Sequence, residues 1–378
     1  RPWLSERQYL NALSFCMLLP GPEAMQLATY AGWRLHGVMG GLAAGLMFVL
    51  PGALVILALG GLYAAFGGVP LVEALFLGVK AAVVVIVLQA LLKVAKRALS
   101  GLDQWAIAGL AFLGIFFLAL PFPLIVAAAA AYGFLFGAKA AEEPTAPAAR
   151  LGETARTAAI WLAVWLAPLF AVGALDGMLA EIGAFFSRLA VVTFGGAYAV
   201  LAYMAQEVVA DYGWLEAGEM MDGLGLAETT PGPLILVTEF VGFLAAAKAG
   251  GFWFGVAGAA VALWATFAPC FLWIFVGAPY IEWIGAQPRL KGALSAITAA
   301  VVGVILNLAI WFALHVFFRE VAEGSAGPLT LWTPELASFE WRAAALTALC
   351  AALMLRFGWG LAATLGLSAA LGVALSSV

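Results

Sequence analysis

Two Pro-Gly-Pro tripeptides, bordered by acidic and hydroxyl side chains, are the parts of this sequence best suited to binding chemistry. Proline lacks an amide hydrogen and glycine has no side chain to pack, so each tripeptide should end one helix and start another at its second proline. A helix start carries unpaired N–H groups and about half a positive charge, which favours an anion. We therefore expect two anion cradles, formed by Pro20, Gly21 and Pro22 and by Pro231, Gly232 and Pro233. The simpler alternative is a kinked helix that only helps packing.

Side chains next to the tripeptides extend this candidate site. Glu23 and Gln26 follow the first tripeptide, and Thr229 and Thr230 precede the second. Hydroxyl groups can donate hydrogen bonds to the oxygens of an oxyanion. The Cys16 thiol borders the first tripeptide in the same way. We expect these residues to line a substrate site.

Three carboxylates near the tripeptides are candidates for proton coupling. They are Glu23, Glu228 and Glu239. A buried carboxyl group is easier to protonate than an exposed one, because burial disfavours its charged form. For Glu23, capping of a half-helix or pairing with a lysine is an equal alternative. Asp222 and Glu219 lie farther from the tripeptides, and we expect them at a water-filled mouth.

Lys80 is the best cationic candidate for the substrate site. It falls near the middle of an apolar run from 70 to 92. A lysine at the centre of a bilayer costs on the order of 3 kcal/mol, so it should face protein or water. Snorkelling to the membrane surface or an ion pair between helices is the alternative.

The composition requires a membrane protein. Apolar residues make up 65% of the 378 positions and charged residues 10%, and the mean hydropathy is +1.06. There is no basic stripe for nucleic acid, and the three cysteines lack metal-site spacing. Motifs for nucleotide hydrolysis, zinc proteases and serine hydrolases are absent, so we expect neither an enzyme nor a metal or other cofactor.

Hydropathy predicts an all-α polytopic membrane protein. A spanning helix needs about 20 apolar residues, and such stretches occur at 38–66, 74–92, 104–119, 122–137, 158–176, 254–276, 290–318, 338–355 and 357–376. The charged, proline-containing stretch near 139–157 predicts an exposed linker. We divide the chain into a first repeat (1–137), the linker (138–157), a connecting transmembrane helix (158–177) and a second repeat (178–378).

The two halves repeat each other. The tripeptides are 211 residues apart, as are Trp3 and Trp214, whereas Pro51 and Pro269 are 218 residues apart. Basic residues end the span 74–92 but begin the span 290–318, so the positive-inside rule places the halves in opposite orientations. We therefore predict two inverted-topology repeats with broken, re-entrant half-helices, a common plan of secondary transporters. Broken helices are tolerated in a membrane where they line a cavity.

Three longer strings give the chain a family resemblance. They are LLPGPEAMQLATY (18–30), TFGGAY (193–198) and DGLGLAETTPGPLI (222–235). Together they resemble the signatures of the chromate transporter family, in a long-chain member with two halves. The resemblance adds Gly195 and Gly196 to the substrate-binding candidates. The first-half counterpart of TFGGAY would lie before Arg1, so we expect a further helical segment there.

The resemblance implies export of chromate across the bacterial inner membrane by a multi-pass secondary transporter, driven by the membrane potential or the proton gradient. Sulfate has a similar tetrahedral dianion, so transport or exchange of sulfate or another divalent oxyanion is the alternative. A passive anion channel and an intramembrane enzyme are further alternatives. The expected partners are chromate or sulfate and the lipid bilayer, without nucleic acid, and a homodimer is left open.

Overall fold

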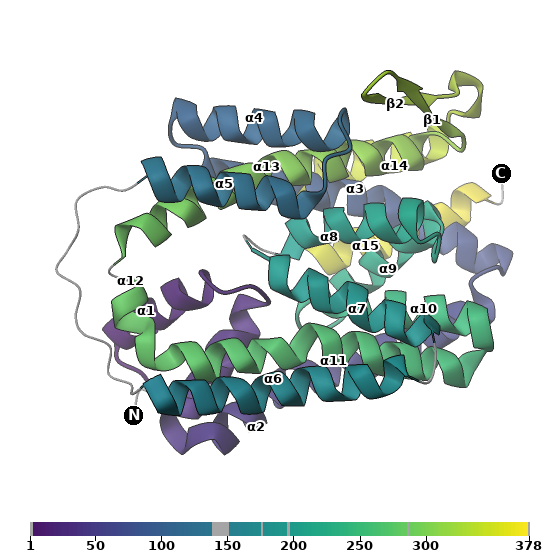
Figure 1. The fold of residues 1–378 in the computed structure, drawn as a ribbon. Helices are drawn as coiled ribbons and strands as arrows, with labels where there is room; N and C mark the ends of the chain where they lie inside the picture. Colours follow the sequence, from purple (N-terminus) through teal and green to yellow (C-terminus); the bar gives the residue numbers. More distant parts are fainter. Residues whose placement is uncertain (1–2, 138–150, 175–176, 195–196, 286, 377–378) are drawn as a thin grey trace. The chain divides into compact units, whose positions relative to one another are not determined.

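The computed structural model describes residues 3–137, 151–174, 177–194, 197–285 and 287–376. Most of these residues are helical, as the hydropathy pattern predicts, and Figure 1 shows the elements along the chain. The chain forms two compact units. Unit 1 comprises Arg1–Gly60, Ala127–Val200 and Thr230–Thr298, and unit 2 comprises Gly61–Val126, Leu201–Thr229 and Ala299–Val378. Each unit contains parts of both predicted repeats, so the repeat boundaries stay a prediction about sequence symmetry.

The elements of unit 1 are α1 (Glu6–Cys16), α6 (Leu151–Gly173), α7 (Gly177–Val192), the 3-10 turn Leu234–Leu236, α10 (Val237–Gly250), α11 (Phe252–Gly277), the 3-10 turn Ala278–Tyr280 and α12 (Ile281–Gly285). Those of unit 2 are α3 (Pro70–Ala98), α4 (Leu102–Phe116), the π-helical turn Glu207–Asp211, α9 (Ala217–Thr229), β1 (Val321–Ala326), β2 (Leu329–Pro334), the 3-10 turn Leu336–Ser338, α14 (Trp341–Ala351), the π-helical turn Ala352–Arg356 and α15 (Leu361–Ser376). The remaining helices run from one unit into the other: α2 (Glu23–Phe66), α5 (Phe122–Phe136), α8 (Ala197–Gln206) and α13 (Pro288–Phe317).

Five helices of the described chain are long and apolar enough to cross a membrane. They cover Glu23–Phe66, Pro70–Ala98, Leu151–Gly173, Phe252–Tyr280 and Pro288–Phe317. Shorter apolar helices occupy Leu102–Phe116, Phe122–Phe136 and Leu361–Ser376. The chain is therefore an all-α polytopic membrane protein, and each span predicted from hydropathy overlaps a helix of the described residues.

Both tripeptides are followed by a helical hairpin. In α2 the helix breaks at His36 and Gly37, where Gly37 has a φ of +64°. The two arms pack so tightly that a Cβ on Gly32 would lie 2.2 Å from the Gly40 carbonyl oxygen. The second half has the same succession, because α10 turns into α11 at Gly251. A helix, a Pro-Gly-Pro break, a second helix, a glycine turn and a long helix therefore occur once in each half.

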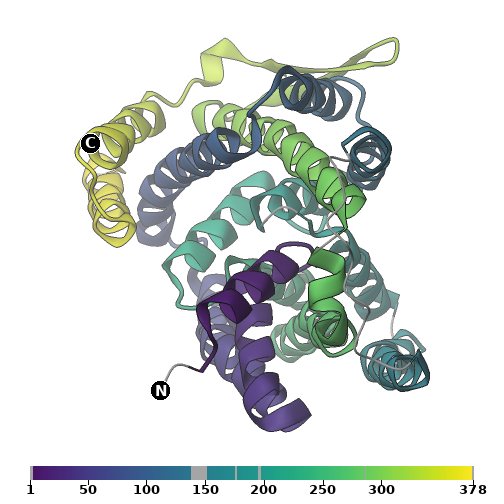
Figure 2. The ribbon, with the colours of Figure 1, turned by 90° about the vertical axis from the view of Figure 1, so that its left-hand side faces the viewer.

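Within each unit, one long helix organises the packing. In unit 1, α11 contacts α6, α7 and α10, and α1 lies against α12, as Figure 2 also shows. In unit 2, α3 contacts α9, α14 and α15. Small residues at the crossings bring backbones together, as is usual between membrane helices. For example, a Cβ on Gly133 of α5 would lie 2.2 Å from the Gly292 carbonyl oxygen of α13.

The opposite orientation of the halves stays a prediction, and accessibility of two segments tests it. The segment 93–101, which carries Lys93, Lys96 and Arg97 at and beyond the end of α3, should face the cytoplasm, and the lysine-free segment 207–214 should face outside. In a variant without native cysteines, a single cysteine at Lys96 should react with a membrane-impermeant thiol reagent only in inside-out vesicles. A cysteine at Asp211 should react only in right-side-out vesicles. Labelling of both positions from one side would contradict the inverted topology.

Candidate functional site

The first tripeptide forms a bend between α1 and α2 that requires glycine. Gly21 has a φ of +116°, a conformation that residues with a side chain rarely adopt. Its amide donates a 3.0 Å hydrogen bond to the carbonyl of Thr193, the residue that follows α7. The Gln26 side chain crosses the bend, because its Nε2 donates to the Pro20 carbonyl at 2.7 Å. The Cys270 thiol of α11 and Gln26 Nε2 both lie against Gly21, because a Cβ there would be 2.8 Å and 2.9 Å from them. A hydrogen bond to Thr193 and packing against α11 therefore hold the first break in place.

The second tripeptide has the same local geometry. Gly232 has a φ of +132°, so its backbone is also in the region that favours glycine. Helix α9 ends at Thr229, and a 3-10 turn begins at Leu234, directly after Pro233. This turn leads without interruption into α10 at Val237. Both interruptions fall where the sequence predicts them.

Each break packs against a long helix of the other half. Gly52 follows Pro51 in α2, and a Cβ on Gly52 would lie 2.4 Å from the carbonyl oxygen of the second tripeptide's first proline. Cys270 follows Pro269 in α11, and its sulfur would lie 2.8 Å from a Cβ on Gly21. Gly52 and Cys270 are separated by 218 residues, the same offset as the two helix prolines. Both contacts lie within unit 1. The two breaks therefore make reciprocal contacts within one compact unit.

Both helix starts present amides that make no hydrogen bond to the residues that the structure describes. Inside each helix, the first backbone bond is made by the amide of Gln26 at 3.1 Å and of Leu236 at 3.0 Å. At these two starts, the amides for which the described residues provide no acceptor are those of Glu23, Ala24, Met25, Leu234 and Ile235. Such amides, together with the positive end of the helix dipole, can bind an oxyanion.

The two helices that follow the second break, α10 and α11, carry buried polar residues: Thr238, Glu239 and Thr266. Glu239, in the first turn of α10, is 1% exposed, and its Oε2 atom has no hydrogen-bond partner among the described residues. The Thr266 hydroxyl donates to the Thr238 hydroxyl at 3.3 Å, and Thr238 donates to the Ile235 carbonyl at 2.8 Å. An uncompensated buried carboxylate is costly, which suits Glu239 to hold a proton. Its part in coupling stays a prediction.

The remaining predicted residues occupy different surroundings. The Thr229 hydroxyl donates to the Leu226 carbonyl at 2.8 Å, so its hydrogen is used inside α9. Glu23, Glu228 and Thr230 are half-buried. Gly195 and Gly196 lie outside the described residues. In unit 1 the structure thus brings together both tripeptides, Glu23, Gln26 and Glu239, whereas Lys80, Glu228 and Thr229 belong to unit 2.

Lys80 has a specific partner in unit 2. Its Nζ atom lies 3.3 Å from the Asp222 Oδ2 atom of α9, and the Tyr63 hydroxyl donates to the same oxygen at 2.8 Å. Asp222 is only 4% exposed, so the expectation that it faces a water-filled mouth is wrong: α9 packs on α3 and turns this carboxylate toward Lys80. Lys80 thus forms an ion pair between helices, which is one of the alternatives that the sequence gives for it.

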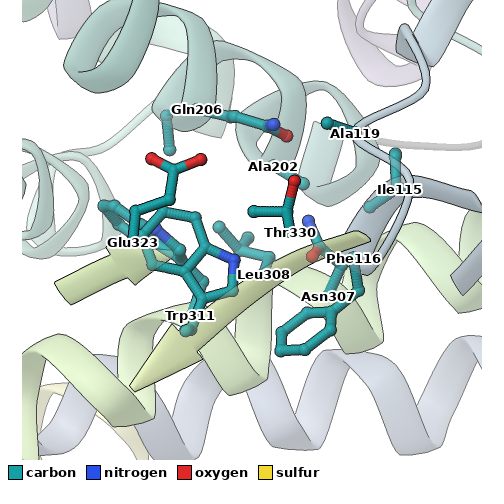
Figure 3. A pocket seen from close by; sticks show the side chains of 12 residues that line it. Ile115, Phe116, Ala119, Ala202, Gln206, Asn307, Leu308, Trp311, Glu323 and Thr330 are labelled. Atoms are coloured by element: carbon teal, nitrogen blue, oxygen red, sulfur yellow. The ribbon is translucent and has the colours of Figure 1, made fainter. Parts of the chain in front are cut away.

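A small polar cavity lies elsewhere in unit 2, beneath the β-hairpin. It leaves about 20 Å³, enough for one water molecule. Figure 3 shows Gln206, Asn307, Glu323 and Thr330 around it, next to Trp311. The Thr330 amide of the hairpin donates a 2.7 Å hydrogen bond to the carbonyl of Phe117, the residue that follows α4. This bond attaches the hairpin to the end of α4. The hydropathy pattern gave no indication of this hairpin.

The loop that follows the hairpin is acidic. The Glu335 amide donates to the Glu320 carbonyl at 2.9 Å. A side-chain hydrogen bond from Glu335 to Glu320, and then the negative charge of Glu320, raise the pKa of Glu335. Arg319 forms an ion pair with Glu340 beside them. These contacts fix the ends of the hairpin, and none involves a tripeptide.

A protein family and several known proteins match this chain over most of its length. The family model described as "Chromate transporter" matches residues 1–134 and 180–373. A chromate transport protein of Cupriavidus metallidurans is 32% identical over 315 residues, which are 82% of this chain and 74% of the relative. A probable chromate transport protein of Synechococcus elongatus is 31% identical over 81% of this chain and 74% of its own. One from Pseudomonas aeruginosa, named a chromate transport protein, is 32% identical over 80% and 71%. No solved structure matches.

Proposed function

Because the chain belongs to the chromate transporter family, we propose that it exports chromate from the bacterial cytoplasm as a secondary transporter of the inner membrane. The membrane potential or the proton gradient supplies the energy. The observation that carries this proposal is the reciprocal packing of the two breaks in unit 1. It supports one oxyanion site that draws on both helix starts, because each break is held by the half that contains the other.

Binding is proposed to use the backbone more than charged side chains. The amides of both helix starts would donate to the oxygens of the dianion, as fixed dipoles that need no counter-ion. Gln26 would hold the first start in place through its bond to Pro20. Glu239 would carry the proton where one is coupled to transport, with Glu23 and Glu228 as the other candidates.

Sulfate is the alternative substrate, because it presents the same tetrahedral arrangement of four oxygens and the same charge. Nothing in the amide arrangement favours chromate over sulfate. The two are separated by competition, in which excess sulfate either suppresses chromate flux or leaves it unchanged. A passive channel is distinguished in the same vesicles: at a clamped potential, its flux does not respond to collapse of the proton gradient.

Flux measurements test the proposed export directly. Proteoliposomes loaded with chromate should lose it faster when potassium and valinomycin make the interior negative, because each negative charge moving outward gains about 2.3 kcal/mol per 100 mV. The initial rate should saturate with internal chromate. Protein-free liposomes of the same lipid are the control. A rate that is independent of the imposed potential and of the pH gradient would contradict a secondary transporter.

A further inference from the structure

The contacts around Asp222 indicate that this carboxylate can change its partners and is not only a structural contact. Asp222 accepts hydrogen bonds from Tyr63 and Lys80 through the same oxygen, Oδ2. Its other oxygen, Oδ1, is buried and has no partner among the described residues. A carboxylate kept for stability would be expected to use both oxygens, since an unsatisfied buried acceptor is destabilising. One binding position on Asp222 is therefore unused.

A second carboxylate acts on the Lys80–Asp222 pair. Lys80 is paired with Asp222, and the negative charge of Glu219, one turn earlier on α9, also acts on Asp222. Glu216 acts on the neighbouring Tyr63 hydroxyl. Buried ion pairs contribute little to stability, because desolvation offsets the attraction between the charges. The pair is thus better explained by a change in its charge state than by its contribution to folding.

Lys80 is the accessible member of the pair. Its side chain is 26% exposed, whereas that of Asp222 is 5% exposed. Lys80 lies ten residues into α3, roughly 15 Å along the helix, which is half the thickness of a bilayer core. Gly218 of α9 leaves the ammonium group uncovered, because a Cβ there would lie 3.1 Å from Nζ. A ligand can therefore approach Lys80 without displacing a side chain of α9.

We propose that Lys80 and Asp222 form a proton-linked oxyanion site in unit 2: a proton binds Asp222, and the Lys80 ammonium then pairs with a divalent oxyanion. This inference rests on the proposed function for the identity of the oxyanion. The step is an exchange of partners. Asp222 gains one proton from water, the Lys80–Asp222 ion pair is lost, and a Lys80–oxyanion pair replaces it.

Electrostatics makes the two events cooperative. With Asp222 ionised, an oxyanion at Lys80 would lie a few ångströms from a carboxylate, and the two would repel each other. With Asp222 protonated, that repulsion disappears and Lys80 keeps its full charge. The Tyr63 hydroxyl continues to hold Oδ2 in both states, so α9 need not move. Each oxyanion that binds should then take up about one proton, and its affinity should fall up to about tenfold per pH unit above the titration of Asp222.

Calorimetry counts this proton. Purified protein is titrated with chromate in mildly alkaline solution, where chromate is a dianion, in two buffers of different ionisation enthalpy. The parent protein should take up about one proton for each chromate that binds at Lys80. The Asp222→Asn variant should take up none while still binding chromate. In Lys80→Met, proton uptake should also vanish, and the half-saturating concentration for flux should rise about tenfold or more, because a charge-assisted contact is lost.

Two further variants separate the linkage from folding and from general charge. Glu73→Gln removes an exposed carboxylate from the same helix and should keep the proton uptake of the parent. The double variant Lys80→Met/Asp222→Asn buries no unpaired charge, so it should fold and should lack proton uptake. Comparison of its thermal unfolding with that of Lys80→Met shows whether the effect of the single substitution is a folding defect.

The outcomes are distinct. Unchanged proton uptake in Asp222→Asn, or loss of uptake in Glu239→Gln with retention in Asp222→Asn, overturns the proposal. Proton release on binding overturns it as well. If the parent binds sulfate with uptake of one proton through Asp222 but does not bind chromate, the site is supported and the chromate function fails. If neither anion binds, both proposals fail.

Discussion

Replacement of Gly21 or Gly232 by alanine is expected to destabilise the protein and to abolish chromate flux, with Gly21→Ala the more severe. Both glycines have a φ between +116° and +132°, where a side chain adds strain of about 1–3 kcal/mol. At Gly21 the new Cβ would also lie 2.8 Å from the Cys270 sulfur and 2.9 Å from Gln26 Nε2. At Gly232 the nearest atom is the flexible end of Leu236, at 3.1 Å. At Gly21 the Cys270 and Gln26 side chains must therefore shift to make room for the Cβ.

Thermal unfolding of purified protein in detergent measures the difference between the two variants. Gly109→Ala is the matched control, because Gly109 is helical and a Cβ there would contact nothing within 4 Å. It should unfold at the parent temperature or slightly above, since alanine favours a helix over glycine by about 1 kcal/mol. Changing Cys270 to glycine should partly rescue Gly21→Ala and should not rescue Gly232→Ala. Equal stability of Gly21→Ala and Gly109→Ala would show that the bend does not require glycine.

The sequence predicts the broken helices well, because the cause of each break is local. Proline and glycine act on their own backbone, so Gly21 and Gly232 could be assigned special conformations without knowledge of the fold. Long apolar runs predict the spanning helices for the same reason. The burial of Glu239 also follows from its place in an apolar half-helix.

The contacts between distant segments could not be predicted in this way. Lys80 and Asp222 are both charged residues in apolar surroundings, which indicates that each needs a partner, but helical periodicity does not say which residue that partner is. Tyr63 gives no such signal, since tyrosine is common near the ends of membrane helices. Gly52 is one of many glycines in the chain, and its role became visible only from its distance to the second break. The repeat offset was the available clue, because it equates Gly52 with Cys270.

The β-hairpin was missed because its signal is weak. Strand β2 alternates exposed and half-buried residues, and Gly327, with a φ of +64°, supplies the turn. Two short strands next to long apolar helices contribute little to a hydropathy profile. A hairpin of this kind also needs support from its surroundings, and here the supporting contact is the 2.7 Å bond from the Thr330 amide.

The proposed proton linkage at Asp222 has a consequence for the energy source. If a proton accompanies each dianion, one net negative charge moves with the pair. Export would then gain about 2.3 kcal/mol per 100 mV of inside-negative potential, while the outward proton would move against its gradient. Under this scheme the membrane potential drives export, and a steeper inward proton gradient slows it. Antiport with protons would require the opposite linkage, in which chromate and a proton compete for the site.

Gly52→Ala is expected to abolish chromate binding at the tripeptide site of unit 1, because Gly52 contacts the second break from α2. Its Cβ would lie 2.4 Å from the Pro231 carbonyl oxygen and 2.5 Å from the Leu236 side chain. Real Cβ atoms do not approach a backbone oxygen so closely, so the break must move away from α2. Such a shift would misdirect the amides of Leu234 and Ile235, and displacement by about 1 Å is enough to disable a preorganised site.

Gly133→Ala is the matched control for this prediction. Gly133 also lies in unit 1, and its Cβ would lie 2.2 Å from a backbone oxygen, that of Gly292, where α5 crosses α13. The two substitutions are therefore similar in their cost to packing, but the control contacts neither tripeptide. Both variants should unfold at a lower temperature than the parent. Chromate affinity, measured by calorimetry on the folded fraction in the Lys80→Met background, which lacks the site proposed in unit 2, should be lost in Gly52→Ala and kept in Gly133→Ala. If Gly52→Ala binds chromate with the affinity of that background, the second break does not form an oxyanion site, and binding in unit 1 must be assigned to the first break.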